Sequence, residues 1–250
     1  MKSDAELIVG LHALEAALKY QPQDIEEIWL DSQRRDDRIQ KIITLAKKSG
    51  VRINKVTRDY LQDKFRDQRH QGVAASVTPG KPKKETDLEQ ILAQESQPFL
   101  LVLDGVQDPH NLGACLRSAD AAGVHAVIVP RDRAVGLTAT VRKVASGAAE
   151  SIPLIQVTNL ARTLRELKEQ GVWLVGLAGE SNDDLYACDL KGPVAIVMGA
   201  EGEGMRRLTK EHCDFLVHIP MAGSVESLNV SVATGICLFE VVRQRAAVMA

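Results

Sequence analysis

The sequence predicts an α/β protein in which a small α/β unit is followed by a larger domain built on a parallel sheet. Two observations carry this prediction. From Pro98 onward, short continuous apolar runs alternate with segments of helical periodicity, which is typical of a parallel sheet buried on both faces. Before it, the stretch TPGKPKKETD combines prolines, a glycine and charges without apolar periodicity. We therefore expect domains at 1–78 and 98–250, joined by a linker at 79–97.

The composition is that of a globular protein, because 45% of the 250 residues are hydrophobic and 26% are charged. Aromatic residues make up only 4% and the formal net charge is −2, so neither stacking platforms nor bulk charge indicate a nucleic-acid binder. No apolar run approaches the roughly 20 residues that span a bilayer. The first residues lack the apolar centre of a signal peptide, and the four cysteines form no CxxC pair. We expect a cytoplasmic protein with free thiols, no membrane segment and no metal.

In the first unit, apolar side chains recur with helical or strand spacing. The expected helices are 10–20, 37–48 and 58–65, and the expected strands are 25–30, 51–56 and 73–77. Gly50 is a typical C-cap for the second helix.

In the larger domain, six strands are expected in the sequences FLLVLDGV, HAVIVP, IPLIQV, VWLVGLA, PVAIVMGA and FLVHIP. The expected helices are 111–122, 138–145, 160–170, 206–212 and 229–245. Parallel sheets bind ligands at the carboxyl ends of their strands, so the chemistry is expected in the loops that follow these runs.

Three of these loops contain more small and polar residues than a plain connection needs. The first, DGVQDPHNLGACLRSADAAG, follows FLLVL and contains Asn111 and Arg117. Asp108 and Asn111 are typical of a helix start, so a capped helix is the structural alternative to a functional role. The third, IPMAGSVESLNVSVATGICLFE, follows FLVH, and its structural alternative is a helix start capped by Ser227 or Asn229.

The second loop, MGAEGEGM, follows PVAIV and places Glu201 among three glycines, which permit a ligand to approach the backbone closely. The glycine spacing is not GxGxxG, and no ribose-binding acid lies about 20 residues later. The pattern therefore argues against a dinucleotide site.

Together and in this order, NLGACLR (111–117), MGAEGEG (198–204) and IPMAGSVESLNVSVA (219–233) resemble the three motifs of the SpoU, or TrmH-like, SPOUT family of RNA ribose 2′-O-methyltransferases. The resemblance covers the chain from Pro98 to near its end, and no motif position departs from the pattern. It implies a parallel-sheet SPOUT domain with a C-terminal trefoil knot. Composition could not suggest this knot, because knots are rare enough to be excluded by default. It also implies a homodimer with its active site near the interface, and an amino-terminal RNA-binding domain similar to ribosomal protein L30e.

The resemblance further implies that S-adenosylmethionine is the cofactor and that the methyl acceptor is a guanosine ribose in 23S ribosomal RNA, the large-subunit RNA. The implied cofactor-binding residues are Leu177, Ala178, Gly179, Gly199, Ala200, Glu201, Ile219, Met221 and Leu228. The implied catalytic residues are Asn111, Arg117, Glu201, Ser227 and Asn229.

Arg117 occupies the position proposed as general base in this family. A guanidinium has a pKa above about 12, so holding a phosphate or stabilising the developing alkoxide is chemically easier. Both roles stay open. The other implied catalytic residues are expected to orient Arg117 and the ribose, and His110, which adjoins the first motif, is a further candidate for the base.

Three alternative functions are kept. The first is the same chemistry on transfer RNA. The second is a non-catalytic RNA-binding module that has lost the cofactor, against which the complete motifs argue. The third is a nucleotide-dependent oxidoreductase, against which the missing dinucleotide pattern argues.

Overall fold

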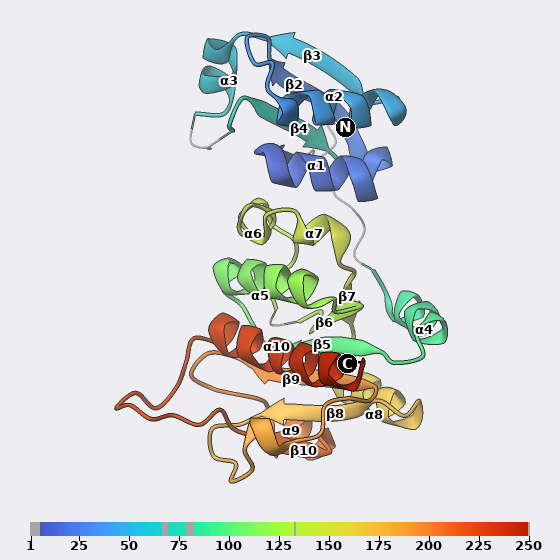
Figure 1. Cartoon of the computed structure of the whole chain (residues 1–250), viewed down its shortest axis with the longest axis vertical. Coiled ribbons are helices and arrows are strands. Elements are labelled where there is room, and N and C mark those ends of the chain that lie inside the picture. The colour runs from blue at the N-terminus through green and yellow to red at the C-terminus, as the bar shows by residue number, and fades with distance from the viewer. Residues whose placement is uncertain (1–5, 67–69, 79–82, 133, 250) are drawn as a thin grey trace. The chain divides into compact units, whose positions relative to one another are not determined.

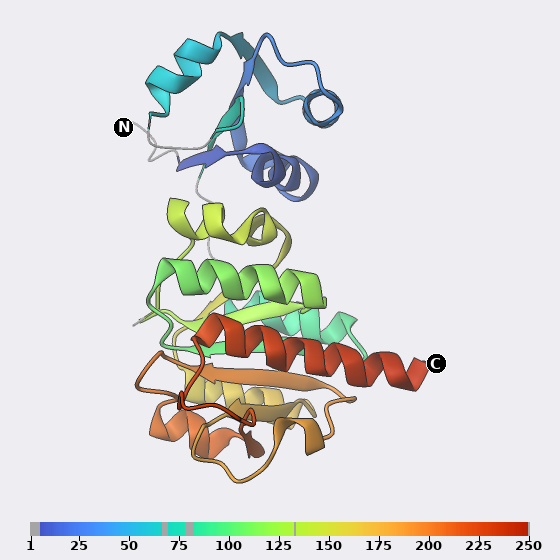
Figure 2. The ribbon, with the colours of Figure 1, turned by 60° about the vertical axis from the view of Figure 1, so that its left-hand side comes forward.

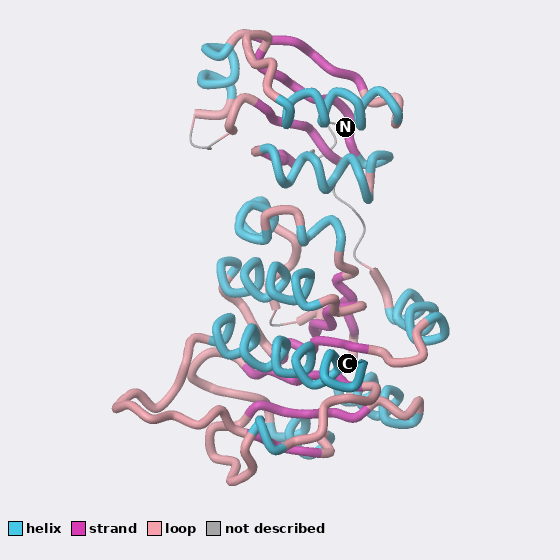
Figure 3. The backbone as a smooth tube through the Cα atoms, in the orientation of Figure 1, coloured by secondary structure: helices cyan, strands magenta, loops and turns pink. Residues whose placement is uncertain are grey.

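The structure is a computed structural model that describes residues 6–66, 70–78, 83–132 and 134–249 (Figures 1 and 3). By its internal contacts the chain divides into two compact units. The first comprises Met1–Lys81 with Leu137–Ser151, and the second comprises Pro82–Gly136 with Ile152–Ala250. Each unit has its own sheet and is described by itself.

The first unit contains a four-stranded sheet with the order β1-β4-β2-β3. Its elements are β1 (Glu6–Val9), α1 (Leu11–Tyr20), η1 (Pro22–Asp24), β2 (Ile25–Asp31), α2 (Asp37–Lys48), β3 (Arg52–Val56), α3 (Arg58–Lys64), β4 (Val73–Val77), α6 (Ala139–Ala145) and α7 (Ala148–Ser151). Strands β2 and β3 are parallel, whereas β4 is antiparallel to β1 and β2. The expected helices and strands of this unit lie at or next to the expected bounds. Elements β1, η1 and α7 are additions to them, and α6, which was expected in the larger domain, belongs to this unit by its contacts.

The core of the first unit lies between the sheet and one layer of helices. Leu14 of α1 and Ile42 of α2 are buried against Ile28 of β2 in one cluster. A smaller cluster contains Trp29 of β2 and Leu61 of α3. Because successive strand residues point to opposite faces, these two clusters occupy the two faces of the sheet.

The second unit contains a six-stranded sheet with the order β10-β8-β9-β5-β6-β7, and every pair in it is parallel. Its elements are α4 (Glu85–Gln94), β5 (Phe99–Asp104), α5 (Pro109–Ala122), β6 (Ala126–Pro130), β7 (Leu154–Val157), α8 (Leu160–Glu169), β8 (Trp173–Leu177), η2 (Leu185–Ala187), β9 (Val194–Gly199), α9 (Arg207–His212), β10 (Phe215–Val217) and α10 (Val230–Met249). The predicted parallel sheet and all six predicted strands are confirmed.

Helices cover both faces of this sheet. Leu88 of α4 and Leu164 of α8 belong to one buried cluster with Leu100 of β5. Helices α5 and α10 contact each other and lie side by side over the sheet (Figures 1 and 2). All six residues of β5 are buried, which explains why this strand is apolar throughout rather than alternating. Among the described residues, no helix is long and apolar enough to span a membrane.

The stretch 79–97, expected as a linker, contains helix α4. Leu88 is buried, and Ile91 and Leu92 pack against the same cluster. Residues at spacings of three and four lie on one face of a helix, so this short stripe attaches α4 to the second unit.

The last helix is hydrogen-bonded to the loop between β8 and β9. The Gln244 side chain is buried; its Nε2 donates to the carbonyl oxygen of Cys188 at 2.9 Å, and its Oε1 accepts from the backbone N–H of Leu190 at 2.9 Å. Arg245 Nη2 donates to the carbonyl oxygen of Gly192 at 2.7 Å. A trefoil knot requires the last segment to pass through such a loop, and the knot itself stays a prediction.

The turn after β9 leaves no room for a side chain at Gly199, the last residue of the strand. The backbone N–H groups of Ala200 and Gly204 each donate to the carbonyl oxygen of the other at 3.0 Å. This closure brings Gly204 so near to Gly199 that a Cβ on Gly199 would lie 2.1 Å from the carbonyl carbon of Gly204. Glycine is therefore required here by the fold of the turn.

We expect Gln244→Ala to lower the free energy of unfolding by about 1–3 kcal/mol, because it leaves the buried N–H of Leu190 and the partly buried C=O of Cys188 without partners. Urea unfolding monitored by far-UV circular dichroism measures this change. Gln94→Ala, an exposed glutamine at the end of α4, is the matched control and is expected to have little effect. Equal stability of the two variants would show that the hydrogen bonds of Gln244 do not stabilise the fold.

We expect Gly199→Ala to destabilise the protein by about 1–3 kcal/mol, since the backbone of the turn must move away from the new methyl group. Gly179→Ala is the control, because no atom lies within 4 Å of its Cβ position. Thermal unfolding without any ligand distinguishes the two substitutions. Similar melting temperatures for both variants would show that the turn adapts without cost.

Candidate active site

The three motif loops meet at one edge of the parallel sheet. Strand β9 lies between β5 and β8, and β8 pairs with β10. Because these strands are parallel, the loops that follow them leave the sheet at the same edge. The register pairs Asp104, the last residue of β5, with Gly199, the last residue of β9, so the first and second loops start side by side.

Three side chains from three segments form a closed hydrogen-bonded ring. Asn111, in the first turn of α5, donates from Nδ2 to Glu201 Oε2 at 3.0 Å. Asn229 Nδ2 donates to Asn111 Oδ1 at 3.0 Å and makes a longer contact of 3.5 Å with Glu201 Oε1. The ring brings together three of the five predicted catalytic residues.

Asn229 has a second role at the start of α10. Its Oδ1 accepts from the backbone N–H of Ser231 at 2.9 Å and from the hydroxyl of Ser231 at 2.6 Å. An asparagine that accepts from a backbone N–H in the first turn is a helix N-cap. The cap therefore fixes the rotamer of the same side chain that completes the ring.

Helix α5 begins at the carboxyl edge of the sheet with a cap of its own. Asp108 accepts from the backbone N–H of His110 at 2.9 Å, and Pro109 occupies the first helical position. This start places Asn111 in the first turn, where it is buried. His110 is exposed.

The loop that carries Glu201 is fixed at its far end by an ion pair. Asp104 is fully buried, and its carboxylate accepts from Arg206 at the backbone N (3.0 Å), Nε (2.6 Å) and Nη2 (2.5 Å). Charge-assisted bonds of this kind are stronger than neutral ones. The segment from Gly199 to Arg206 is therefore bound to β5 at one end and closed on itself at the other.

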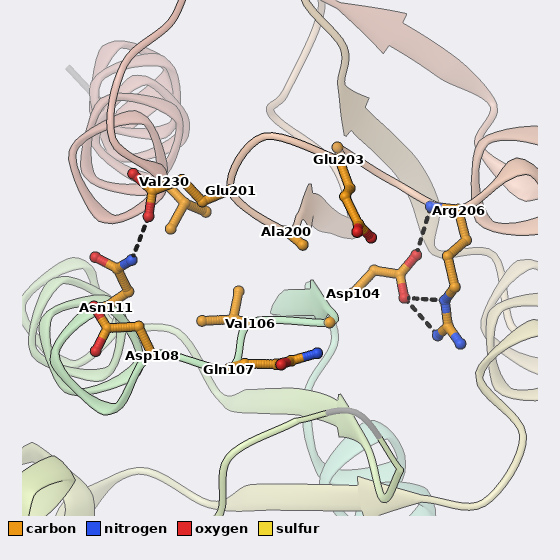
Figure 4. Close-up of a pocket in the computed structure, with 12 residues that line it drawn as sticks. Asp104, Val106, Gln107, Asp108, Asn111, Ala200, Glu201, Glu203, Arg206 and Val230 are labelled. Carbon is orange, nitrogen blue, oxygen red and sulfur yellow. Dashed lines mark hydrogen bonds and ion pairs between the residues drawn. The ribbon is translucent and has the colours of Figure 1, made fainter.

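A hollow of about 240 Å³ lies between the first and second loops (Figure 4). It is lined by residues 104–108, Asn111, residues 200–201, 203–204 and 206, and Val230. The hollow therefore borders two of the three residues of the ring.

The predicted cofactor residues lie at the ends of three neighbouring strands. Leu177, Ala178 and Gly179 end and follow β8, and the N–H of Ala178 donates to the carbonyl oxygen of Val217 in β10 at 2.9 Å. Gly199, Ala200 and Glu201 end and follow β9. Ile219, Met221 and Leu228 belong to the loop after β10, and Met221 is exposed.

The structure does not bring Arg117 or Ser227 into the ring. Within the residues described, neither side chain makes a hydrogen bond or ion pair, and both are exposed. Arg117 lies about 240° around α5 from Asn111, since successive residues of a helix are about 100° apart. Helix α5 of a single chain therefore presents Asn111 and Arg117 in different directions.

The thiol beside the ring is structural. Cys115 of α5 is buried against Thr234 of α10, with Sγ and Oγ1 3.5 Å apart. Burial raises the pKa of the Cys115 thiol to about 11, so the group is neutral at pH 7 and is a poor nucleophile. All four cysteines are free, as expected, although Cys188 and Cys213 are only half-buried.

The sequence reasoning did not single out Asp104, Gln107, Glu203 or Arg206 as site residues. Asp104 and Arg206 are distant in the chain, and no local spacing links them. Glu203 was visible only as one more acid in the glycine-rich turn. The topology, which pairs β5 with β9, is what makes them neighbours.

Comparison with known proteins agrees with the motifs. The model of the SpoU rRNA Methylase family matches residues 98–239, and that of the RNA 2′-O ribose methyltransferase substrate binding family matches residues 7–83. The 23S rRNA (guanosine-2′-O-)-methyltransferase RlmB of Shewanella oneidensis is 60% identical over 240 residues, which are 96% of this chain and 98% of that protein.

Solved structures agree as well. One described as an RNA 2′-O ribose methyltransferase is 28% identical, with a TM-score of 0.78 over 98% of this chain and 90% of that chain. The SpoU methyltransferase AviRb of Streptomyces viridochromogenes, solved with AdoMet, has the same fold, with a TM-score of 0.79 at 23% identity over 96% of this chain and 90% of its own. Because the family model covers more than half of the chain, and because its three motifs lie in loops at one edge of the sheet, the chain belongs to the SpoU rRNA methylase family.

Proposed function

We propose that this chain transfers a methyl group from S-adenosylmethionine to the ribose 2′-hydroxyl of a guanosine in 23S ribosomal RNA. The name of the Shewanella oneidensis relative supports this substrate, since that protein shares 60% of its residues over nearly the whole chain. The observation that carries the proposal is the ring of Asn111, Glu201 and Asn229, in which one residue from each motif is hydrogen-bonded to the other two.

The residues at the ends of β8, β9 and β10 fit an adenosylmethionine. Around Leu177–Gly179 and Ile219–Met221 the available groups are backbone amides and carbonyls with small or apolar side chains, which suit the uncharged adenine of the cofactor. Gly179 and Gly223 have open space beside them, so ligand atoms can approach the backbone there. When bound, this cofactor supplies a methyl group on a positively charged sulfur.

The protein's own residues then have to hold the ribose oxygen in line with that methyl group. Positioning of reacting atoms at about 3–3.5 Å accounts for much of the rate in transfers of this kind. The ring fixes the Asn111 amide, and the turn around Gly199 fixes Glu201. Ser227 in the exposed loop after β10 is proposed to orient the ribose with them.

Arg117, supplied by a second copy of the chain, is proposed to act on the ribose 2′-hydroxyl that accepts the methyl group. It points away from Asn111 on the same helix, so it reaches a ring most simply in a partner's site. There its guanidinium either holds the target phosphate and stabilises the developing alkoxide or, as the family role suggests, accepts the proton. A homodimer is thus part of the proposed mechanism.

The surface around Arg117 suits such a dimer. Val232 and Phe239 of α10 are 52% and 49% exposed, and they lie on one side of the helix. Gly235 between them lies against Ser118, the neighbour of Arg117, with its Cβ position 3.6 Å from Ser118 Oγ. Exposed apolar surface next to a functional arginine is typical of an interface between protein subunits.

The first 78 residues are proposed to bind the RNA and residues 98–250 to bind the cofactor and catalyse transfer, with 79–97 between them. The match of a substrate-binding family to residues 7–83 supports this division. A ribosomal RNA substrate also suggests that the protein acts in the cytoplasm.

The direct test is transfer of labelled methyl from adenosylmethionine to unmodified 23S ribosomal RNA, with the product mapped by nuclease resistance and mass. We expect a single 2′-O-methylguanosine from the wild type. We expect Arg117→Ala to keep its fold and cofactor affinity, because the side chain has no partner in the described structure, but to lose about two to three orders of magnitude in transfer rate.

Arg117→Lys in the same assay separates charge from geometry, since lysine keeps the charge but not the planar fork. Near-normal transfer by Arg117→Ala would refute its role. Methylation of transfer RNA in place of 23S RNA would keep the chemistry and change the substrate. Cofactor binding without transfer to either RNA would favour the non-catalytic alternative.

The dimer proposal is tested by mixing two inactive variants. We expect Asn111→Ala and Arg117→Ala homodimers to be inactive, whereas co-expressed heterodimers, isolated with two different tags, recover transfer because one of their two sites has both residues intact. Homodimers of Arg117→Ala, isolated with the same two tags, are the control. No recovery, or a monomeric wild type by light scattering, would contradict the shared site.

A further inference from the structure

The hollow between the first and second motif loops lies largely outside the proposed cofactor site. Of the predicted cofactor residues only Ala200 and Glu201 border it, whereas the segments after β8 and β10 do not. Its volume of about 240 Å³ is below the roughly 300–1,000 Å³ of sites for drug-sized ligands. A space of this size suits a single nucleobase better than a whole cofactor.

The walls of the hollow combine apolar surface with free hydrogen-bonding groups. Val106, Ala200 and Val230 contribute the apolar part. In Figure 4 the Glu203 carboxylate and the Gln107 side chain approach the hollow from opposite sides. Within the residues that the structure describes, neither of these two side chains makes a hydrogen bond or ion pair.

The other charged groups in the hollow are already engaged. Asp104 is neutralised by Arg206, and one carboxylate oxygen of Asp108 accepts from the start of α5. Glu201 is held in the ring. Glu203 is therefore the carboxylate that is free to accept two hydrogen bonds from a ligand.

Guanine matches these walls. Its Watson–Crick edge presents two adjacent donors, N1–H and the 2-amino group, beside the O6 acceptor, and a carboxylate can accept from both donors at once. The amide of Gln107, on the opposite side of the hollow, can donate to the N7 acceptor on the other edge of the base. Adenine would place its N1 lone pair against the carboxylate, so the same walls disfavour it. Unstacked bases in RNA are read in this way, by contacts to the Watson–Crick edge and by packing on their faces.

The hollow is also in the right place. It borders Asn111 and Glu201 of the ring, at which the ribose is proposed to react. A nucleotide with its base in the hollow would place its ribose next to the ring, because base and ribose are joined by one bond.

We propose that this hollow binds the guanine of the target nucleotide and that Glu203 determines specificity by accepting hydrogen bonds from N1–H and the 2-amino group. The inference rests on the proposed function, since it names the base that this methyltransferase selects.

The test pairs a change in the protein with a change in the base. Wild type, Glu203→Ala and Glu203→Gln are assayed for kcat/KM on a 23S RNA fragment with either guanosine or inosine at the modified position. Inosine lacks only the 2-amino group. We expect the wild type to be about ten-fold slower or more on inosine, and Glu203→Ala to be slow on both RNAs with little difference between them. Glu203→Gln, which keeps one acceptor, is expected to lie between the two.

Glu169→Gln, an exposed carboxylate at the end of α8, is the matched control and should keep the wild-type ratio. The melting temperature and the adenosylmethionine affinity of each variant are measured to check that the fold and the cofactor site are unchanged. Equal wild-type rates on guanosine and inosine, or an unchanged ratio in Glu203→Ala, would overturn the base-binding role of the hollow. Absence of transfer to the guanosine RNA by the wild type would instead refute the proposed function.

Discussion

The carboxylate of Glu201 holds together three segments that are far apart in the chain, and the geometry of the site depends on it. Asn111 donates to one of its oxygens, and Asn229 contacts the other while donating to Asn111. Such a ring is strong only when each donor meets an acceptor, and an ionised carboxylate is an acceptor at both oxygens. A negative charge near a sulfonium also stabilises the ground state, which does not by itself raise the rate of transfer. The benefit of Glu201 is therefore better explained by the fixed orientation of Asn111.

The ring would not hold its shape if the loop carrying Glu201 moved freely. Two constraints prevent this. The turn is closed by the reciprocal bonds of Ala200 and Gly204, and the Asp104–Arg206 ion pair attaches its far end to β5. Preorganised polar groups need little rearrangement during the reaction, which is the main source of electrostatic catalysis. A buried carboxylate such as Asp104 is tolerable because three donors of one arginine satisfy it.

The sequence predicted the order and type of the elements well because the larger domain is a parallel sheet. Strands buried on both faces are apolar throughout, and helices between them show clear periodicity, so patterns such as FLLVLD and VAIVMG have one plausible reading. Helix α4 was hidden because prolines and lysines before it suggested a linker, although the spacing of Leu88, Ile91 and Leu92 is helical. Strand β1 was missed because it has only four residues, ELIV, and so short a run carries little periodic signal.

Within the site, the contacts between residues distant in the chain could not be predicted from the sequence. The motifs pointed to Asn111, Glu201 and Asn229, and the structure places all three in one ring. No spacing in the sequence links Asp104 to Arg206, or places Gln107 and Glu203 at one hollow, because these residues come together only through the register of β5 against β9. The separation of Arg117 from Asn111, by contrast, follows from helical periodicity alone, because both residues lie in the predicted helix 111–122.

The helix-cap interpretation of the motif residues and their functional interpretation are compatible. Asn229 caps α10 with its Oδ1 and completes the ring with its Nδ2. Asp108 caps α5 with one oxygen and lines the hollow. A cap has one preferred rotamer, so its remaining atoms point in a fixed direction, which is what a binding site at the carboxyl edge of a parallel sheet requires. In this fold the residues that begin the helices are therefore also the residues best placed to orient a substrate, and a sequence pattern typical of a helix start supports a functional site rather than arguing against one.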